Sequence, residues 1–348
     1  MNPLIPMILL SSLGLGTTLT FASSHWLLAW MGLEINTLAI IPMMSRHHHP
    51  RAVEATTKYF LIQATAAALI LFASLTNAWL TGTWNIQQLS NPAATTLAML
   101  GLALKIGLAP THFWLPEVLQ GLDLTMGLIL STWQKLAPFA LIYQIAPTIQ
   151  PTLLITLGVL SALVGGWGGL NQTQLRKILA YSSIAHLGWM IIILQLMPSL
   201  TILNLGIYIT MTTTIFLALK MNATTKINTL ATTWAKTPVL ATMTTLALLS
   251  LGGLPPLTGF APKWLIIQEL TKQNLSPTAT TMAMAALLSL FFYLRLCYTT
   301  ALTISPNTSN TISHWRTAPT RTSLILPLTM TGAMMLLPIT PAILSLTN

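Results

Sequence analysis

The stretch "LAMLGLALKIGLAPTHFWLPE" (97–117) contains the combination of residues that decides the fold. It begins as an apolar run suited to a membrane helix, carries one lysine, Lys105, inside that run, and then breaks at Gly107 and Pro110. Proline interrupts a helix, and irregular backbone at membrane depth survives only where it is buried in protein or lines a cavity. The stretch therefore predicts a broken membrane helix that carries a buried cation.

The composition of the whole chain indicates a membrane protein. Of its 348 residues, 53% are hydrophobic and 6% are charged, and the mean hydropathy is +0.72. Soluble domains carry about 25% charged residues. Apolar runs of about 20 residues recur along the chain, whereas the alternating segments typical of a transmembrane barrel do not occur in the sequence. We expect an all-α polytopic membrane protein.

Several other classes of protein are disfavoured by the sequence. The net charge of +10 does not indicate a nucleic-acid partner, because the basic residues are scattered singly and are not interleaved with aromatic residues. The single cysteine, Cys297, excludes a disulfide framework, a cysteine-ligated zinc site and an iron–sulfur cluster. The histidine-rich tract at 46–51 has only Glu54 as an acidic neighbour, and we interpret it as a solvated loop without a metal.

Breaks at Gly, Pro, Asn and Ser clusters and at charges divide the chain into about eleven expected spans. Their approximate bounds are 3–21, 25–44, 56–80, 93–109, 124–146, 152–170, 177–197, 200–220, 238–270, 277–299 and 323–345. The fourth and ninth are the spans that we expect to be interrupted. The N-terminal segment is interpreted as the first span and not as a removable signal.

The loop charges predict the orientation. Every second loop, starting after the second span, collects eleven of the fifteen basic residues: Arg46, Arg51, Lys58, Arg176, Lys177, Lys220, Lys226, Lys236, Arg295, Arg316 and Arg321. The opposite loops hold only Lys272. This bias places the basic loops and the N-terminus on the cytoplasm-like side, and an odd span count places the C-terminus opposite.

The remaining three basic residues, Lys105, Lys135 and Lys263, fall inside expected spans, as does Glu34 in "WMGLEINTLAI". Facing lipid, these four charges would cost on the order of 10 kcal/mol together. They are therefore expected to face the bundle interior, one another, or water. Snorkelling toward the interface is the alternative for charges near span ends, and it suits Lys58 and Lys220.

Buried ionisable groups of this kind suit proton transfer. Desolvation disfavours the ammonium form of a lysine, and a nearby carboxylate favours it, so a lysine whose counter-ion moves becomes a switchable proton carrier. Glu34 is the natural modulator of Lys105. Two intramembrane histidines, His112 and His186, could relay protons, although a histidine satisfied by core contacts is the common alternative.

The break after Lys105 has a counterpart in the second half of the chain. "GLAPTHFW" (107–114) and "GLPPLTGFAPKW" (253–264) both contain Gly-Leu-x-Pro, then an aromatic residue, with a lysine close by. Paired interrupted helices in two halves are typical of inverted-repeat transporters, whose sites lie at the breaks. Proline kinks that serve only packing are the alternative.

Three segments carry a resemblance to a known family. "QLRKILAYSSIAHLGWM" (174–190), "LALKIGLAPTHFWLPEVLQG" (102–121) and "LLSLGGLPPLTGFAPKW" (248–264) resemble the antiporter-like proton-translocating subunits of respiratory complex I. The resemblance covers essentially the whole chain. It implies two inverted five-helix repeats at 1–146 and 152–299, with broken helices near 107–112 and 253–262, followed by a C-terminal transmembrane helix at 323–348.

The resemblance also implies roles for single residues. Glu34 and Lys105 match the gating pair, Lys135 the central lysine, and His186 a histidine on the connecting axis. Lys263 matches the terminal lysine that leads toward a neighbouring pumping subunit, and His112 occupies another polar position on the axis.

The location, cofactors and partners are implied in the same way. The family implies the mitochondrial inner membrane, with the N-terminus and basic loops on the matrix side and the C-terminus on the intermembrane-space side. NADH, FMN, iron–sulfur clusters and ubiquinone are expected in partner subunits, because this chain has no glycine-rich dinucleotide motif or cysteine set. The expected partners are other membrane-arm subunits, including an antiporter-like neighbour and small membrane subunits, and lipids such as cardiolipin.

Two alternatives stay open: a subunit of a multi-protein cation/proton antiporter, and a structural subunit without its own proton path.

The pairing of Glu34 with Lys105 can be tested directly. The substitutions Glu34→Gln and Lys105→Ala should each impair proton movement, because the first removes the charge that modulates the lysine and the second removes the carrier. NADH-driven acidification of proteoliposomes measures the effect. Unchanged pumping in both variants would contradict the pairing.

Overall fold

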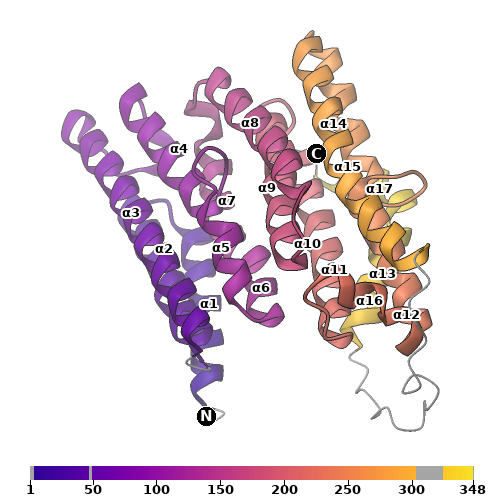
Figure 1. The fold of residues 1–348 in the computed structure, drawn as a ribbon. Coiled ribbons are helices and arrows are strands. Elements are labelled where there is room, and N and C mark those ends of the chain that lie inside the picture. The colour runs from indigo at the N-terminus through magenta and orange to yellow at the C-terminus, as the bar shows by residue number, and fades with distance from the viewer. Residues whose placement is uncertain (1–3, 47–48, 303–323, 348) are drawn as a thin grey trace. The chain divides into compact units, whose positions relative to one another are not determined.

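The computed structural model describes residues 4–46, 49–302 and 324–347 (Figure 1). Within these ranges the chain is built from α-helices and short 3₁₀ turns, and the only extended pairings are two isolated β-bridges. The chain divides into two compact units, Met1–Leu160 and Ser161–Asn348. Two basic residues assigned to loops from the sequence, Arg316 and Arg321, lie outside the described residues.

The first unit consists of seven helices and the start of an eighth. They are α1 (Leu4–Ala22), α2 (Trp26–Met44), α3 (Pro50–Thr81), α4 (Pro92–Ile106), α5 (Trp114–Gly121), α6 (Leu124–Ser131), α7 (Trp133–Ile145) and α8 (Pro151–Gly169). Short 3₁₀ turns lie at Ile86–Gln88 and Ala146–Thr148. Within the unit α1 packs on α2, α3 packs on α4 and α5, and α7 packs on α1 and α4.

The second unit contains the rest of α8 and the remaining helices. They are α9 (Leu175–Ile193), α10 (Pro198–Met221), α11 (Ile227–Ala231), α12 (Thr233–Lys236), α13 (Pro238–Gly252), α14 (Phe260–Lys272), α15 (Ser276–Ala301), α16 (Ile325–Met335) and α17 (Thr340–Thr347), with a 3₁₀ turn at Leu337–Ile339. Here α10 packs on α13 and α16, and α13 packs on α15. Helix α9, which carries the "SSIAH" segment, is buried along most of its length.

The helices have the length and composition of membrane spans. Among the described residues, six helices are long and apolar enough to cross a membrane, namely α1, α2, α3, α8, α10 and α15, and a seventh is counted if the bent pair of α16 and α17 is one span. Two further apolar helices, α4 and α13, are shorter, and each ends at one of the predicted breaks. The fold confirms the class expected from the sequence, an all-helical membrane protein.

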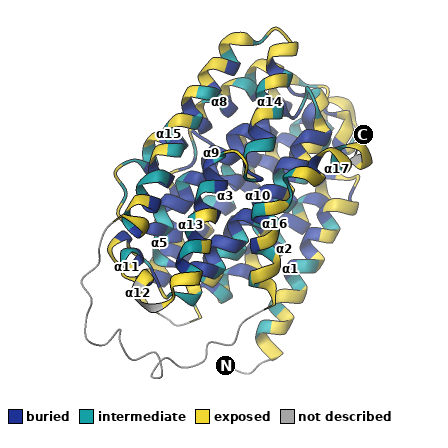
Figure 2. Ribbon diagram, turned by 90° about the vertical axis from the view of Figure 1, so that its right-hand side faces the viewer, coloured by how far each residue is buried: buried dark blue, intermediate teal, exposed yellow. Residues whose placement is uncertain are grey.

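Many large apolar residues are exposed on the helices, in addition to those buried between them; Figure 2 colours each helix by the burial of its residues. Phe72 and Trp79 on α3 and Leu287 and Phe291 on α15 are all exposed. Hydrocarbon tails are as apolar as leucine, so such faces are stable in a bilayer, where burial of apolar area does not drive helix association. Close packing and hydrogen bonds must then hold the helices together.

Close packing is clearest between α1 and α2. A Cβ atom added at Gly16 would lie 2.4 Å from the Asn36 side-chain oxygen and 2.9 Å from the backbone oxygen of Gly32. A Cβ atom added at Gly32 would lie 2.6 Å from a side-chain carbon of Thr20. Small residues let membrane helices approach closely, which increases van der Waals contact. The glycines therefore fix the spacing of this helix pair.

Two expected spans contain interruptions that the sequence did not predict. The span 124–146 is divided at Thr132, where the hydroxyls of Ser131 and Thr132 both donate to the carbonyl of Leu128, at 3.0 and 2.7 Å. Such side-chain bonds compete with the helical ladder and bend membrane helices. The C-terminal span bends by 66° between α16 and α17, where Pro338 lies in the intervening 3₁₀ turn and has no N–H to continue the ladder. The expectation of only two interrupted spans was therefore wrong.

The glycine contact between α1 and α2 predicts opposite effects for two nearby substitutions. Gly16→Ala should destabilise the helix pair by about 1–3 kcal/mol through overpacking. Gly14→Ala, on the same helix but with open space around its Cβ position, should be neutral or stabilising by up to about 1 kcal/mol through helix propensity. Thermal stability of the assembled complex measures both, and equal effects would contradict the packing described.

Candidate functional site

The first broken helix ends where the sequence places Gly107. Helix α4 stops at Ile106, and Gly107 adopts a left-handed conformation with φ of 85°. The backbone N–H groups of Gly107 and Leu108 both donate to the carbonyl of Ala103, at 2.9 Å each. Glycine adopts positive φ without steric cost, which makes it the common residue at the end of a helix. The chain resumes as a helix at Trp114.

Side chains from elsewhere in the first unit satisfy the last carbonyls of α4. The indole N–H of Trp114 donates to the carbonyl of Leu104 at 3.1 Å, and the amide of Gln63 on α3 donates to the carbonyl of Lys105 at 3.2 Å. The last carbonyls of a helix have no intrahelical partner, and an unpaired carbonyl is costly in a membrane. The two donors therefore stabilise the break.

Lys105 and Lys135 line the same small cavity. It has a volume of about 10 Å³, which is room for about one water molecule. The two lysine side chains are 5% and 2% exposed, so both belong to the interior of the unit. The polar side chains around them come from four other positions on α2, α3 and α7, together with one aromatic hydroxyl: Asn36, Thr37, Gln63, Gln134 and Tyr59.

Glu34 lies near this cavity without an ion pair to it. Its carboxylate is close enough to interact electrostatically with Lys105, and Thr37 donates a hydrogen bond of 2.8 Å to one carboxylate oxygen. The Lys105 ammonium has no hydrogen-bond partner among the described residues. It also lies in the last turn of α4, where the negative end of the helix dipole favours a cation. No ion pair joins the two groups in the described structure, and the lysine is left available to the cavity.

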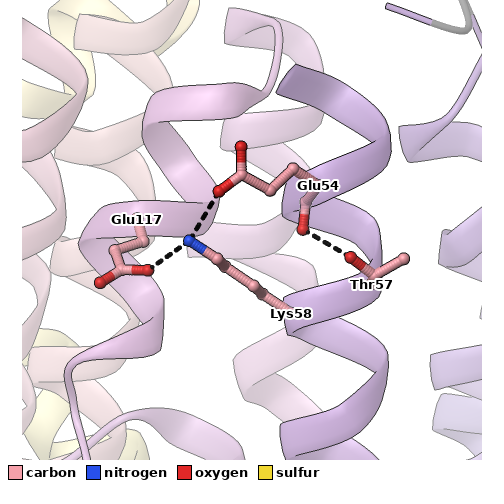
Figure 3. Close-up of polar contacts among 4 residues, drawn as sticks. All are labelled: Glu54, Thr57, Lys58 and Glu117. Carbon is pink, nitrogen blue, oxygen red and sulfur yellow. Dashed lines mark hydrogen bonds and ion pairs between the residues drawn. The ribbon is translucent and has the colours of Figure 1, made fainter. Parts of the chain in front are cut away.

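A second lysine contact secures α5. Lys58 on α3 forms ion pairs with Glu54 at 2.8 Å and with Glu117 on α5 at 2.9 Å (Figure 3). The three side chains are substantially exposed, so the pairs contribute little stability individually, but they connect the helix after the break to α3. The sequence suggested that Lys58 snorkels toward the interface, and its carboxylate partners were not predicted.

The second broken helix uses its lysine differently. Helix α13 ends at Gly252, and Gly253 adopts φ of 82°. Lys263, on α14 after the break, donates to the carbonyl of Gly252 at 2.8 Å and lies 3.4 Å from that of Leu251. A Cβ atom on Gly253 would come within 2.9 Å of the Lys263 side chain, so glycine also gives that side chain access. Here the ammonium itself binds the end of the helix.

The loop of the second break is joined to α16. The hydroxyls of Ser250 and Thr258 both donate to the carbonyl of Ala333, the first at 2.7 Å. This carbonyl lies in the last turn of α16, just before the bend, where helical partners end. Gly259 lies against the Ser250 carbonyl so closely that no Cβ atom would fit. The C-terminal helix is thus fixed to the second break.

The two histidines are both buried. His112 lies within the first break, 4% exposed, with Nδ1 3.3 Å from the carbonyl of Pro110 and its ring beside Phe113. His186 on α9 is 5% exposed, and its ring centroid lies 5.5 Å from that of Tyr208 on α10. His112 does not line the cavity of the two lysines. The two histidines are thus enclosed by protein, each beside an aromatic ring.

The sequence reasoning missed the polar residues that complete the cavity. Tyr59 and Gln63 are four residues apart on α3, and Glu34 and Thr37 are three apart on α2, so each pair shares a helix face. This spacing of polar residues inside apolar helices was the available signal. No group of three or more His, Cys, Asp or Glu side chains suited to a metal is found in the described part of the chain.

Comparisons with known proteins agree over the full length of the chain. Residues 23–292 match the family described as NADH:quinone oxidoreductase/Mrp antiporter, TM, and residues 290–344 match NADH dehydrogenase subunit 2 C-terminus. NADH-ubiquinone oxidoreductase chain 2 of Carassius auratus is 73% identical over 348 residues, with all of both chains covered. That of Squalus acanthias is 65% identical over 347 residues, again with 100% of each chain covered. The chain belongs to the NADH-ubiquinone oxidoreductase chain 2 family.

Solved structures share the fold. A chain of respiratory complex I from Thermus thermophilus is 28% identical, with a TM-score of 0.81 over 100% of this chain and 78% of that one. A chain of the Mrp complex from Dietzia sp. is 19% identical, with a TM-score of 0.80 over 97% of this chain and 74% of that one, which shows the fold alone. The antiporter-like fold of the chain 2 family is therefore confirmed.

Because Gln63 donates a hydrogen bond to the Lys105 carbonyl, its replacement should lower both the stability of the complex and its proton pumping. Gln63→Leu removes the donor to the Lys105 carbonyl, and a buried carbonyl left without a partner costs about 1–3 kcal/mol. Thermal stability of the complex and its proton-to-electron ratio measure the effect. Thr65→Val is the matched control, because Thr65 lies two residues further on α3 and its exposed hydroxyl bonds only within its own helix. A Gln63→Leu complex as stable and as coupled as this control would contradict the role.

Proposed function

We propose that this chain, a membrane-arm subunit of proton-pumping NADH:ubiquinone oxidoreductase, carries protons or charge along a buried axis. The axis consists of Glu34, Lys105, Lys135, His186 and Lys263, with His112 as a further polar position. The observation that supports it most is the shared cavity of Lys105 and Lys135, which has room for about one water molecule. We propose that this transfer of protons or charge is coupled to electron transfer from NADH to ubiquinone in other subunits.

The cavity supplies a short proton route within the first unit. One water molecule can accept from one lysine and donate to the next polar group, and buried hydrogen-bond chains of this kind are strengthened by the low local dielectric. Two ammonium groups on one cavity also repel each other, so protonation of Lys105 disfavours protonation of Lys135. A shift of Glu34 toward or away from Lys105 would then move a proton between them.

In the second unit the relay would pass through His186 and end at Lys263. His186 lies beside Tyr208 on α10, and the phenol group gives the histidine a polar neighbour. Lys263 binds the carbonyls at the end of α13, so loss of its proton would weaken the cap on that helix. Lys263 is proposed as the terminal group, toward a neighbouring antiporter-like subunit.

The finer topology is part of the same proposal. We infer eleven spans, arranged as five-helix repeats at 1–146 and 152–299 with a C-terminal helix at 323–348. The chain is a multi-pass protein of the mitochondrial inner membrane. The loop charges support a matrix location for the N-terminus and the basic loops, and an intermembrane-space location for the C-terminus.

The redox groups belong to other subunits in this proposal. The chain itself is proposed to bind no NADH, FMN, iron–sulfur cluster or ubiquinone. Its partners are other membrane-arm subunits, including small membrane subunits, and lipids such as cardiolipin. Redox chemistry in those subunits would reach this chain as a conformational change or as a shift of charge that acts on Glu34 or the lysines.

Two other functions are less well supported by the observations. A cation/proton antiporter subunit shares the fold, but the relatives at 65–73% identity are NADH-ubiquinone oxidoreductase chain 2. A structural subunit is favoured by one specific contact, the binding of Lys263 to helix-terminal carbonyls, which is a sufficient reason to keep a lysine there. A normal proton-to-electron ratio in a Lys135→Ala complex would support the structural function.

The substitution Lys263→Arg separates the two roles of this lysine. Arginine keeps the charge and the donors that bind the carbonyls, but it does not release its proton in proteins. We expect the Lys263→Arg complex to assemble normally and to lose most of its proton pumping, whereas Lys263→Leu should also lower assembly. Native gels measure assembly, and NADH-driven acidification of proteoliposomes measures pumping.

Lys272→Arg is the control for that experiment, because Lys272 lies exposed in the last turn of the same helix, α14. It should leave both measurements unchanged. Wild-type pumping in the Lys263→Arg complex would show that Lys263 only caps α13, and the axis would then end before it.

A further inference from the structure

Two buried tyrosines of the second unit are not members of the proposed axis. Tyr208 on α10 is 0% exposed and Tyr293 on α15 is 1% exposed. The Tyr293 hydroxyl is buried without a hydrogen-bond partner among the described residues. Burying an unpaired hydroxyl is costly, whereas phenylalanine fills nearly the same space without that cost. Packing therefore does not explain why a tyrosine stands at this position.

Tyr208 lies on a face of α10 that is turned toward the second break. Its ring centroid is 5.5 Å from that of His186 on α9. Met211, three residues further along α10, shares this face, and its sulfur accepts a hydrogen bond of 3.3 Å from the Ser250 hydroxyl in the last turn of α13. A Cβ atom on Gly259, in the loop of the break, would lie 3.2 Å from the same sulfur. One face of α10 thus contacts both the histidine and the break.

Tyr293 lies against the end of α13. Helix α15, which carries it, packs on α9, α13 and α14. A Cβ atom on Gly252, the last residue of α13, would lie 3.8 Å from both Cβ and Cδ2 of Tyr293. The Gly252 carbonyl is the one that accepts the 2.8 Å hydrogen bond from Lys263. Tyr293 is also close enough to Tyr208 to interact with it electrostatically. The two tyrosines therefore lead from His186 to the helix end that holds Lys263.

We propose that Tyr208 and Tyr293 are relay residues that pass protons between His186 and Lys263, an inference that rests on the proposed function and deepens it. A phenol hydroxyl both donates and accepts hydrogen bonds. It can accept a proton on its oxygen from one neighbour and release its own proton to the next, so one O–H bond forms as another breaks. The hydroxyl is neutral again afterwards. No charge is then left in the apolar interior, where an unpaired charge is costly.

The unpaired hydroxyl of Tyr293 suits the last step of this relay. Its donor and acceptor positions are not used by the described residues, so no existing hydrogen bond has to break before a proton arrives. A proton released from Tyr293 to the neutral Lys263 amine forms the ammonium that binds the Gly252 carbonyl. Transfer in the opposite direction removes that donor. The passage of a proton is thereby joined to the capping of α13.

The substitution Tyr293→Phe in the assembled complex tests the relay. It removes only the hydroxyl, and because that hydroxyl has no partner within the described part of the chain, assembly should be normal and thermal stability equal or higher. We expect the proton-to-electron ratio to fall as far as in the Lys263→Arg complex, because either change interrupts the same route. Native gels and thermal unfolding measure the first expectation, and NADH-driven acidification of proteoliposomes measures the second.

Two further variants make the result specific. Tyr298→Phe, on the same helix, is the matched control, because Tyr298 is 55% exposed, and it should leave the ratio unchanged. Tyr208→Phe should lower the ratio as Tyr293→Phe does. The double variant should be no worse than either single one, because residues that act in series on one route are not additive. Independent structural roles would give additive losses.

The outcomes separate this inference from the proposed function. A Tyr293→Phe complex that pumps like the Tyr298→Phe complex would overturn the relay; if Lys263→Arg still abolishes pumping, the axis stands and reaches Lys263 by other groups. Normal pumping in the Lys263→Arg complex as well would end the axis before Lys263, whatever the tyrosines do. A lower ratio that comes with poor assembly or lower thermal stability in Tyr293→Phe would show a structural hydroxyl and would also overturn the relay.

Discussion

The structure depends on one constraint, that a helix broken inside a membrane must satisfy its terminal carbonyls from within the protein. Bulk water is absent from the hydrocarbon core, so a carbonyl freed at a break needs a donor from the chain or from an enclosed water molecule. The donors at the first break are Gln63 and Trp114, and the donor at the second is Lys263. The left-handed glycines, Gly107 and Gly253, turn the chain at both points. The side chains that bind these carbonyls, Gln63, Trp114 and Lys263, are themselves buried.

The two breaks meet this constraint in different ways, with different chemical consequences. At the first, neutral side chains bind the carbonyls of Leu104 and Lys105, which leaves the Lys105 ammonium to face the cavity. At the second, the Lys263 ammonium is itself the donor. A proton that leaves Lys105 changes the charge of a cavity, whereas a proton that leaves Lys263 also weakens a helix cap. In the proposed mechanism, loss of a proton would therefore affect a helix cap directly at the second break.

Much of the fold could be predicted because its signals are local. An apolar run specifies a membrane helix, and the Gly-Leu-x-Pro segments place the two breaks, because the glycine and proline effects act within a few residues. The interruption at Thr132 was missed, since serine and threonine often bond within intact helices and their presence alone does not indicate a break.

The candidate site was predictable only in part for the same reason. Lys105 and Lys135 could be selected as isolated charges in apolar runs. Their shared cavity, and the bond from Gln63 to the Lys105 carbonyl, depend on packing between helices that are far apart in sequence. Glu117 is a similar case, because it is 59 residues from Lys58. Composition and spacing along one helix contain no information about such partners.

The direction of the hydrogen bonds separates structural polar residues from those of the site. Hydroxyls such as those of Thr17, Thr20 and Thr56 donate to carbonyls three residues earlier in their own helices, so they add little polarity between helices. Gln63 and Gln134 instead donate to the backbone of other helices, and both line the cavity of the two lysines. In an interior where most polar groups are satisfied locally, the side chains that bond across helices define the place where a buried charge can be held and changed.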